Sequence, residues 1–357
     1  MTLTATPPEV DATPPAPPVG RAPVRRTPRG WRVVPLLRSV GGTAVITVTV
    51  LLLASVITFG LGALSDSNPA AAALGETATP ADIARLDAEF GLDRPLVVQY
   101  LSWVGNAVTG DLGRSWFTTI PVSDSIRAAL PVDLSIAALA LVLAILIGGS
   151  AGIGAALSNG GPLDRAVTLV CSVLATLPPF VIGMALIVVL SVKLQLLPAG
   201  GYVPLGVDPG EWLRFSILPA LALSLDVAAS IARQLRTSLV GSLRENYAVG
   251  AEMRGFGRSR VLFGHVLRNA AGPTLAVIGL AIPLIIGGAV MTEKLFGLPG
   301  IAQLSLQSAE KGDVPVVLGT LLVTAVIVVA ASLVINVLQT LLDPVARRGG
   351  RTTGARR

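Results

Sequence analysis

Long apolar runs dominate this chain, and six of them are long enough to form helices that cross a membrane. A helix needs about 20 apolar residues to span the hydrocarbon core of a bilayer. The fourth run is the weakest because it contains Pro219 and Asp226. The pattern predicts an all-α integral membrane protein with six transmembrane helices, near residues 41–64, 134–157, 168–192, 215–232, 274–292 and 314–342.

Polar segments divide these runs into five parts. The beginning of the chain is rich in Pro and Arg and has no apolar period, so it cannot bury enough surface to offset its conformational entropy. A secretory signal would have an apolar region of about 7–15 residues, and the first run here is longer. The predicted parts are a disordered tail at 1–38, a first transmembrane helix at 39–64, a segment outside the membrane at 65–131, a core of five further helices at 132–343, and a basic tail at 344–357.

The distribution of arginine predicts the orientation of the chain. Only 13% of the residues are charged, against about 25% in soluble domains. Arginines cluster in both tails and in the strip between the fourth and fifth runs, whereas the segment at 65–131 is mostly acidic. Six crossings place these three basic regions on one side, which the positive-inside bias makes the cytoplasm. The clustering indicates a membrane orientation signal rather than nucleic-acid binding, and membrane lipid is the expected surrounding.

One helix is predicted in the segment at 65–131. The sequence "PADIARLDAEFGL" has helical apolar spacing, with Pro80 as its start signal and Gly91 as its stop signal. We expect a small folded part outside the membrane on the extracytoplasmic side.

The basic strip near residues 242–270 predicts two short cytoplasmic helices joined by a glycine elbow. Ser242 and Glu245 have the spacing of a capping box, which starts a helix, and Gly255 and Gly257 favour a sharp turn after it. Ser259 begins a second helix in this interpretation, and it ends at Gly272 and Pro273. The strip is either a docking element for a cytoplasmic partner or an amphipathic helix on anionic lipid headgroups, and the residues alone leave both open.

No catalytic residue, metal site or bound cofactor is predicted. None of the three lysines is followed by Ser or Thr, as a P-loop would require. The pattern G-x-S-x-G occurs around Ser150, but it lies inside an apolar run, where Gly148 and Gly152 are better explained by close helix packing. The single histidine, His265, has no cluster of partner ligands for zinc. Asp226 is a possible pore or intramembrane polar residue, because a charge inside a crossing is costly; a pairing with Arg233 is the alternative.

The strip resembles the EAA loop of ABC importer permeases, in the branch that imports oligopeptides, dipeptides and nickel. The sequences "YAVGAEMRGF" and "HVLRNAAGP" carry this resemblance. Other segments also resemble the family: "GLDRPLVVQYLSWVGNAVTGDLGRSW", "IPVSDSIRAALP", "LATLPPFVIGMALIVVLSVKLQLLPAGGY", "GGAVMTEKLFGLPGI", "GDVPVVLG" and "LLDPVARR". The matching positions in the loop are Tyr247, Ala251, Gly255, His265, Leu267, Arg268, Asn269, Ala270 and Pro273.

The chain departs from the family pattern at three places. Glu252 and Met253 replace a usual Arg-Ala pair, Asp133 replaces a usual Thr, and the proline-rich tail is extra. The acid at 252 puts in doubt which ATPase subunit docks.

The resemblance implies a type I importer permease of the bacterial inner membrane, with both termini cytoplasmic. The partners implied are a second homologous permease, two cytoplasmic ATPases that carry ATP and Mg, and an extracytoplasmic binding protein. The implied ATPase-docking loop contains Tyr247, Ala251, Glu252, Met253, Arg254, Gly255, Phe256 and Gly257. The rival prediction is an ion-coupled secondary transporter, for which Asp226 is the one supporting residue. Substrate identity, the pore-lining residues and the nature of the partner permease do not follow from the sequence.

Overall fold

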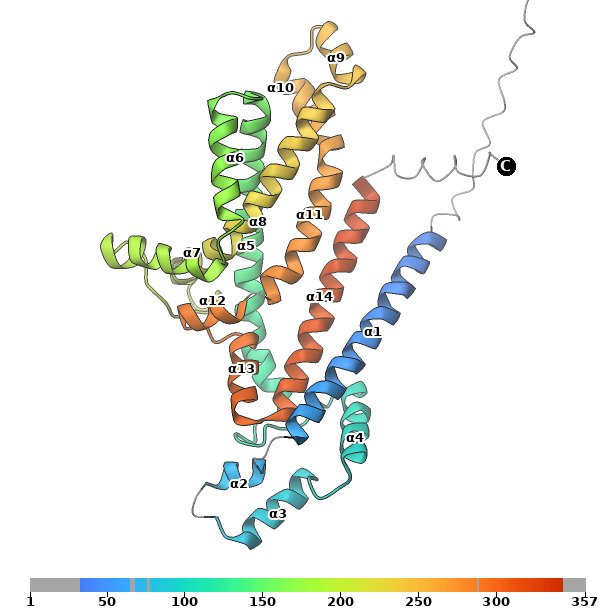
Figure 1. Cartoon of the computed structure of the whole chain (residues 1–357), viewed down its shortest axis with the longest axis vertical. Coiled ribbons are helices and arrows are strands. Elements are labelled where there is room, and N and C mark those ends of the chain that lie inside the picture. The colour runs from blue at the N-terminus through green and yellow to red at the C-terminus, as the bar shows by residue number, and fades with distance from the viewer. Residues whose placement is uncertain (1–32, 65–67, 76–77, 288, 343–357) are drawn as a thin grey trace, which may run out of the picture. The chain divides into compact units, whose positions relative to one another are not determined.

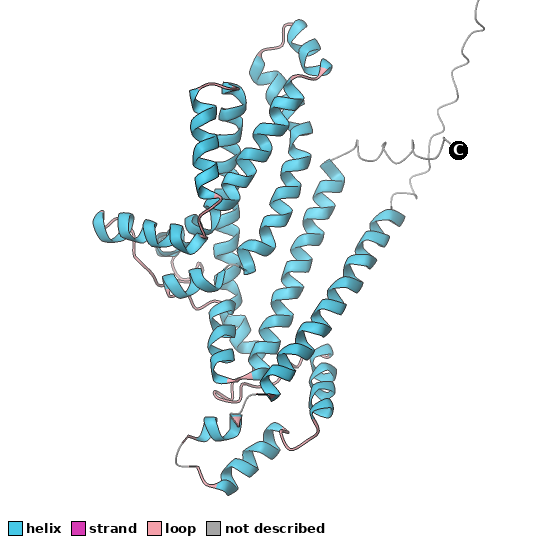
Figure 2. Ribbon diagram, in the orientation of Figure 1, coloured by secondary structure: helices cyan, strands magenta, loops and turns pink. Residues whose placement is uncertain are grey.

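A computed structural model describes residues 33–64, 68–75, 78–287 and 289–342, which are helices and connecting loops (Figure 2). The chain divides into two compact units, residues 1–44 and 45–357. Of the first unit the structure describes only the beginning of the first helix. The predicted tails at 1–38 and 344–357 lie outside the described residues, apart from positions 33–38, where that helix begins.

The described residues form the following helices, labelled in Figure 1: α1 Val33–Ala63, α2 Pro69–Leu74, α3 Pro80–Phe90, α4 Leu96–Val108, α5 Val122–Ser158, α6 Pro162–Leu174, α7 Pro179–Leu186, the π-helix η2 Ile187–Lys193, α8 Pro209–Leu243, α9 Asn246–Met253, α10 Arg258–Val261, the π-helix η3 Leu262–Val266, α11 Leu267–Gly287, α12 Ala289–Phe296, α13 Ile301–Lys311 and α14 Val314–Leu342.

The core of the second unit is built on the close pairing of α5 with α8, and α11 then packs between α8 and α14. Small residues permit the first pairing. A Cβ atom on Gly152 would lie 2.9 Å from the carbonyl oxygen of Ala232, and one on Gly148 would collide with the carbonyl oxygen of Ala228. The predicted packing role of Gly148 and Gly152 is therefore confirmed. Ser150 between them is exposed and donates to the carbonyl of Ile147.

Four helices in the described part of the chain are long and apolar enough to cross a membrane: 122–158, 209–243, 259–287 and 314–335. A fifth crossing is possible if the bent pair 162–174 and 179–193 forms one span, and 48–62 is a shorter apolar helix. The expected single helix at 168–192 was wrong, because the chain turns by 107° between α6 and α7. Two consecutive prolines, Pro178 and Pro179, explain the break, since proline lacks the amide donor that continues a helix.

The predicted helix end at Gly272 and Pro273 was also wrong. Both residues lie inside α11, and residues 259–287 form one continuous span. Helices in membranes tolerate proline because neighbouring groups satisfy the freed carbonyl. The run expected at 274–292 instead starts earlier and ends at Gly287, and α12 follows it as a separate short helix.

The segment between α1 and α5 contains the expected helix. α3 begins at Pro80 and ends before Gly91, whose φ of 72° is left-handed, so this prediction is confirmed. Tyr100 of α4 joins the segment to α1 through a 2.8 Å hydrogen bond with Ser55. Ser115 joins it to the start of α14 by donating to Asp313 over 2.5 Å. These contacts fix the segment to two long helices.

Candidate functional site

The strip between α8 and α11 forms an elbow of short helices (Figure 1). α9 ends at Met253, and Gly255 has a φ of 82°. The amide of Gly255 donates to the carbonyl of Glu252 over 2.9 Å, and the amide of Phe256 donates to that of Ala251 over 3.3 Å. The predicted glycine turn is confirmed at Gly255. We call residues 246–266 the elbow.

The predicted capping box before the elbow was wrong. α8 continues to Leu243, so Ser242 lies in its last turn rather than at a new helix start. The N-cap of α9 is Glu245, and its side chain makes no capping hydrogen bond. Tertiary packing of α8 therefore decides where this helix ends, rather than the local capping pattern.

A buried apolar cluster fixes the elbow to the long helices. Ala251 is fully buried in it, and Leu239 of α8 and Val261 of α10 are buried equally well. Small alanine side chains on α9 permit close packing, so the elbow is attached to α8 through buried apolar contacts. The cluster consists of Ala156, Leu235, Leu239, Ala248, Ala251, Val261, Leu262, Val266 and Ala270.

Other residues of the elbow are exposed, and several of them are apolar. Met253 is 86% exposed, Phe263 60% and Tyr247 38%. Glu252, Arg254, Gly255 and Gly257 are exposed beside them. An exposed methionine and exposed aromatic rings in a segment that also carries exposed charges are typical of a surface that binds another protein.

Phe256 makes its contacts within the elbow rather than toward solvent. It is half-buried and stacks on His265, with ring centroids 6.3 Å apart and an interplanar angle of 22°. The guanidinium of Arg260 lies 5.1 Å from the centroid of the same ring, a favourable cation–π distance. Phe256 and Ala251 therefore stabilise the elbow, whereas Tyr247 and Met253 are available to a partner.

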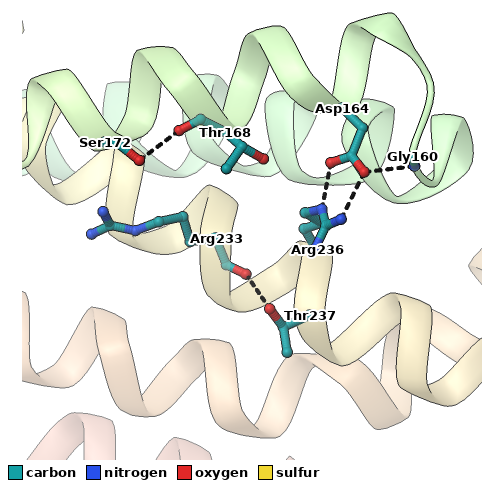
Figure 3. A network of polar contacts seen from close by, with 7 residues as sticks. All are labelled: Gly160, Asp164, Thr168, Ser172, Arg233, Arg236 and Thr237. Carbon is teal, nitrogen blue, oxygen red and sulfur yellow. Dashed lines mark hydrogen bonds and ion pairs between the residues drawn. The ribbon is translucent and has the colours of Figure 1, made fainter.

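An ion pair next to the elbow connects α8 to the start of α6 (Figure 3). The Arg236 guanidinium donates to both oxygens of Asp164, and the bond from Nη2 to Oδ2 is 2.6 Å long. The amide of Gly160, in the turn between α5 and α6, also donates to Oδ2 over 2.7 Å. The Asp164 side chain is 4% exposed and that of Arg236 33%. A forked pair of this kind sets both the distance and the orientation of the joined elements.

Together these contacts connect α8 to two other parts of the molecule, the elbow and α6. Leu235 and Leu239 pack the elbow against the C-terminal part of α8, and Arg236 joins the same turns to the start of α6. The elbow and the start of α6 are therefore both attached to the same turns of α8. Sequence reasoning missed this pair, because Asp164 and Arg236 are 72 positions apart and neither lies in a recognisable motif. The one signal was an acid in the first turn of the helix that follows Gly160 and Gly161.

Asp226 lies within α8 and is half-buried. It takes part in none of the ion pairs found among the described residues. Arg233, two turns further along, instead donates weakly to Ser230 and to the carbonyl of Cys171. Both earlier interpretations of Asp226 remain predictions. Across the described residues, no group of three or more His, Cys, Asp or Glu side chains is arranged to bind a metal.

Two family models match the chain. The model described as the binding-protein-dependent transport system inner membrane component covers residues 144–348. The model for the N-terminal part of such membrane components covers residues 35–137.

Individual relatives agree with the family models. The chain is 34% identical over 298 residues to a probable peptide ABC transporter permease protein of Sinorhizobium fredii, covering 84% of this chain and 95% of the relative. It is 33% identical over 301 residues to the oligopeptide transport system permease AppB of Bacillus subtilis, covering 84% and 95%. The corresponding OppB protein of Salmonella typhimurium is 34% identical over 275 residues, covering 76% and 88%.

A solved structure shows the same fold. It is a chain of the MetNI methionine ABC transporter in inward-facing conformations, with a TM-score of 0.51 and 15% sequence identity. The match covers 61% of this chain and 96% of that one. The fold predicted from the sequence, that of a type I importer permease, is confirmed at this level.

Proposed function

The chain belongs to the family of binding-protein-dependent transport system inner membrane components, and we propose that it forms, with a second permease, the pore through which peptides enter the cell. It is a permease subunit of an ABC importer in the bacterial inner membrane, and such subunits work with ATPases and a substrate-binding protein. As a pore subunit it is not itself an enzyme. The relatives named above are all permeases of peptide transport systems, which does not support the rival ion-coupled transporter.

Peptides are the proposed cargo because the relatives that match most of this chain are named as peptide or oligopeptide permeases. Their similarity extends over the membrane helices and the segment between α1 and α5, rather than over one motif.

The observation that carries the proposed mechanism is the two-sided elbow. Its buried side is attached to α8 through the apolar cluster, and its exposed side presents Tyr247, Met253 and Phe263. We propose that a cytoplasmic ATPase binds the exposed side, together with Glu252 and Arg254, and that nucleotide-driven movement of the ATPase is transmitted to α8. The nucleotide and its Mg belong to the ATPases in this proposal, and two of these subunits serve the permease pair.

The proposal includes six crossings with both termini in the cytoplasm. Four long helices, the bent pair of α6 and α7, and the apolar part of α1 supply them. An even number of crossings brings the elbow and the two arginine-rich tails to the same side, as the positive-inside bias requires. The segment holding α2 to α4 then faces the binding protein outside.

Reconstitution into vesicles tests the proposal. Complete complexes of the permease pair, the ATPases and the binding protein should take up a labelled peptide only with ATP. Met253→Asp should abolish both uptake and retention of the ATPase, because it puts a charge into the centre of the proposed contact. Val207→Asp is the control, since Val207 is 76% exposed but lies in the turn before α8, far from the elbow in sequence.

Two outcomes would contradict the proposal. Unchanged uptake and ATPase retention in the Met253 variant would exclude the elbow as the contact. Uphill uptake by the permease without ATPases, driven by an ion gradient, would exclude the importer mechanism and favour the secondary transporter.

A further inference from the structure

Two carboxyl groups meet at the start of α13, far from the elbow. Asp133 comes from α5 and Glu293 from α12, and the two carboxyl groups converge on Gly300. Glu293 is 2% exposed, and Asp133 is half-buried. The closeness of the pair is visible at Gly300, where an added Cβ atom would lie 2.5 Å from an oxygen of each carboxyl group.

The carboxyl groups replace the missing cap of α13. Its N-cap residue is Gly300, which has no side chain to accept from the first amides. The amide of Ile301 donates to Oδ2 of Asp133 over 2.7 Å, and the amide of Gln303 donates to Oε2 of Glu293 over 2.7 Å. Two distant acids thereby satisfy donors that a helix N-terminus normally leaves open.

The surroundings balance only one negative charge. The helix N-terminus offsets about half an elementary charge, and its amide donors favour one carboxylate. Asp133 and Glu293 line both a chamber of about 720 Å³ and a small cavity of about 20 Å³. Neither is lined by any other charged side chain among the described residues. Two ionised carboxylates in contact would repel each other strongly without a cation between them.

Unpartnered oxygens show that the site lacks a hydrogen-bond donor. Oε1 of Glu293 is buried and has no partner among the described residues, and the same holds for Oγ1 of Thr292, which is 1% exposed. Both residues line the small cavity together with Asp133. A cavity of this size accommodates one water molecule when polar groups surround it. Backbone amides pointing at the carboxyl groups disfavour a metal ion in the same place.

We propose that Asp133 and Glu293 form a proton-binding site in which one proton, shared between the two carboxyl groups, fastens the start of α13 to α5. One carboxyl group donates to the other, and the pair carries a single negative charge that the α13 amides stabilise. Ionising both groups would convert the attraction into a repulsion between α5 and α12. The strength of the contact between α5, α12 and the start of α13 therefore depends on pH, whereas a contact between neutral side chains would not.

The electrostatic environment agrees with this geometry. Glu293 lies in α12, outside the helices long enough to cross a membrane. Burial, together with the charge and hydrogen bond of Asp133, raises the pKa of Glu293 to about 8. A raised pKa means that the folded state binds a proton which the unfolded state has released, so stability falls as the pH rises from the ordinary Glu pKa to about 8.

Infrared spectroscopy of the complete complex tests the site directly. The C=O stretch of a protonated carboxylic acid is separate from the amide bands, and it should be present at neutral pH and disappear on titration past about pH 8. Glu293→Gln and Asp133→Asn should each remove that band. Glu310→Gln, an exposed acid on the same helix α13, should leave it unchanged.

A second measurement separates a proton site from a merely structural contact. The melting temperature of the wild-type complex should fall as the pH is raised from about 5 to about 8. Asp133→Thr, which restores the residue type usual in the family, and Asp133→Asn should flatten that fall. The proposal would be overturned if the C=O band of the protonated carboxylic acid, recorded at neutral pH, persisted in both Asp133→Asn and Glu293→Gln. The proposal would also be overturned if the melting temperature fell equally steeply with pH in the wild type and in the Asp133 variants. This comparison holds even if Glu293→Gln fails to assemble.

Discussion

Arg236 on α8 donates to both carboxylate oxygens of Asp164 at the start of α6, and it does so within the same turns of α8 that carry the elbow cluster. The pair turns three separate elements into one mechanical unit. The Asp164 carboxylate is almost fully buried, so loss of its partner leaves a charge with little access to water.

Breaking this pair should weaken both stability and coupling. Arg236→Ala should destabilise the protein by about 1–3 kcal/mol, less than for a fully buried pair because Arg236 is one-third exposed. Arg236→Lys keeps the charge but loses the fork, and it should reduce peptide uptake more than ATP hydrolysis. Melting curves and uptake in vesicles measure these effects. Arg214→Lys is the control, since its pair with Glu211 is exposed; equal effects in the two lysine variants would contradict the role of Arg236.

The turn of the elbow should tolerate only glycine at position 255. Its φ of 82° is left-handed, which costs other residues about 1–2 kcal/mol. An added Cβ atom has open space around it, so the cost of Gly255→Val is one of backbone strain and should appear as lost ATPase binding and uptake with normal membrane insertion. Gly250→Ala is the control, because it lies within α9 with equal space and no positive φ. Normal uptake in the Gly255 variant would contradict the prediction.

The pairing of α5 with α8 should be sensitive to a single methyl group. Gly148→Ala would push a methyl group into the carbonyl of Ala228, and overpacking of this kind costs about 1–3 kcal/mol. The neighbouring Gly149→Ala meets nothing within 4 Å and should be neutral. Melting temperatures in detergent compare the two variants, and an equal fall in both would show that the contact is not tight.

The joint between Ser115 and Asp313 should make stability depend on pH. Burial raises the pKa of Asp313, while the hydroxyl of Ser115 lowers it. Because the folded state keeps its proton longer than the unfolded state, stability falls as the pH rises above the ordinary Asp value. Ser115→Ala removes the stabilising donor, so it should raise that pKa further and steepen the fall, at a cost of about 1–3 kcal/mol.

Melting curves at several pH values test this joint. Ser102→Ala, at an exposed position of α4, is the control and should match the wild type at every pH. Parallel curves for the wild type and the Ser115 variant would show that the hydroxyl does not act on Asp313.

Local patterns were enough for some elements. Pro80 and Gly91 correctly bounded α3, and Gly255 correctly marked the turn of the elbow, because a proline start and a left-handed glycine act through the backbone of a few residues. The packing of Gly148 and Gly152 followed from their spacing in an apolar run. The docking residues remain a prediction, of which Met253 and Tyr247 have the required exposure.

Other local signals were overridden. Ser242 and Glu245 match the sequence pattern of a capping box, yet α8 continues past Ser242 to Leu243. Pro273 is a typical signal for the end of a helix, yet it lies inside α11. Burial of a long apolar face outweighs a capping preference of about 1 kcal/mol in the first case and a cost of about 3 kcal/mol for proline inside a helix in the second.

The sequence by itself determined the helical membrane class, the resemblance to importer permeases and the position of the elbow, because apolar length, arginine bias and glycine turns act over short stretches of chain. Only the tertiary structure decided which residues of the elbow are buried and which are free, and that Asp164 meets Arg236 and Asp133 meets Glu293. Those pairs join residues that are distant along the chain, and the energy of a buried charge depends on what packing brings next to it.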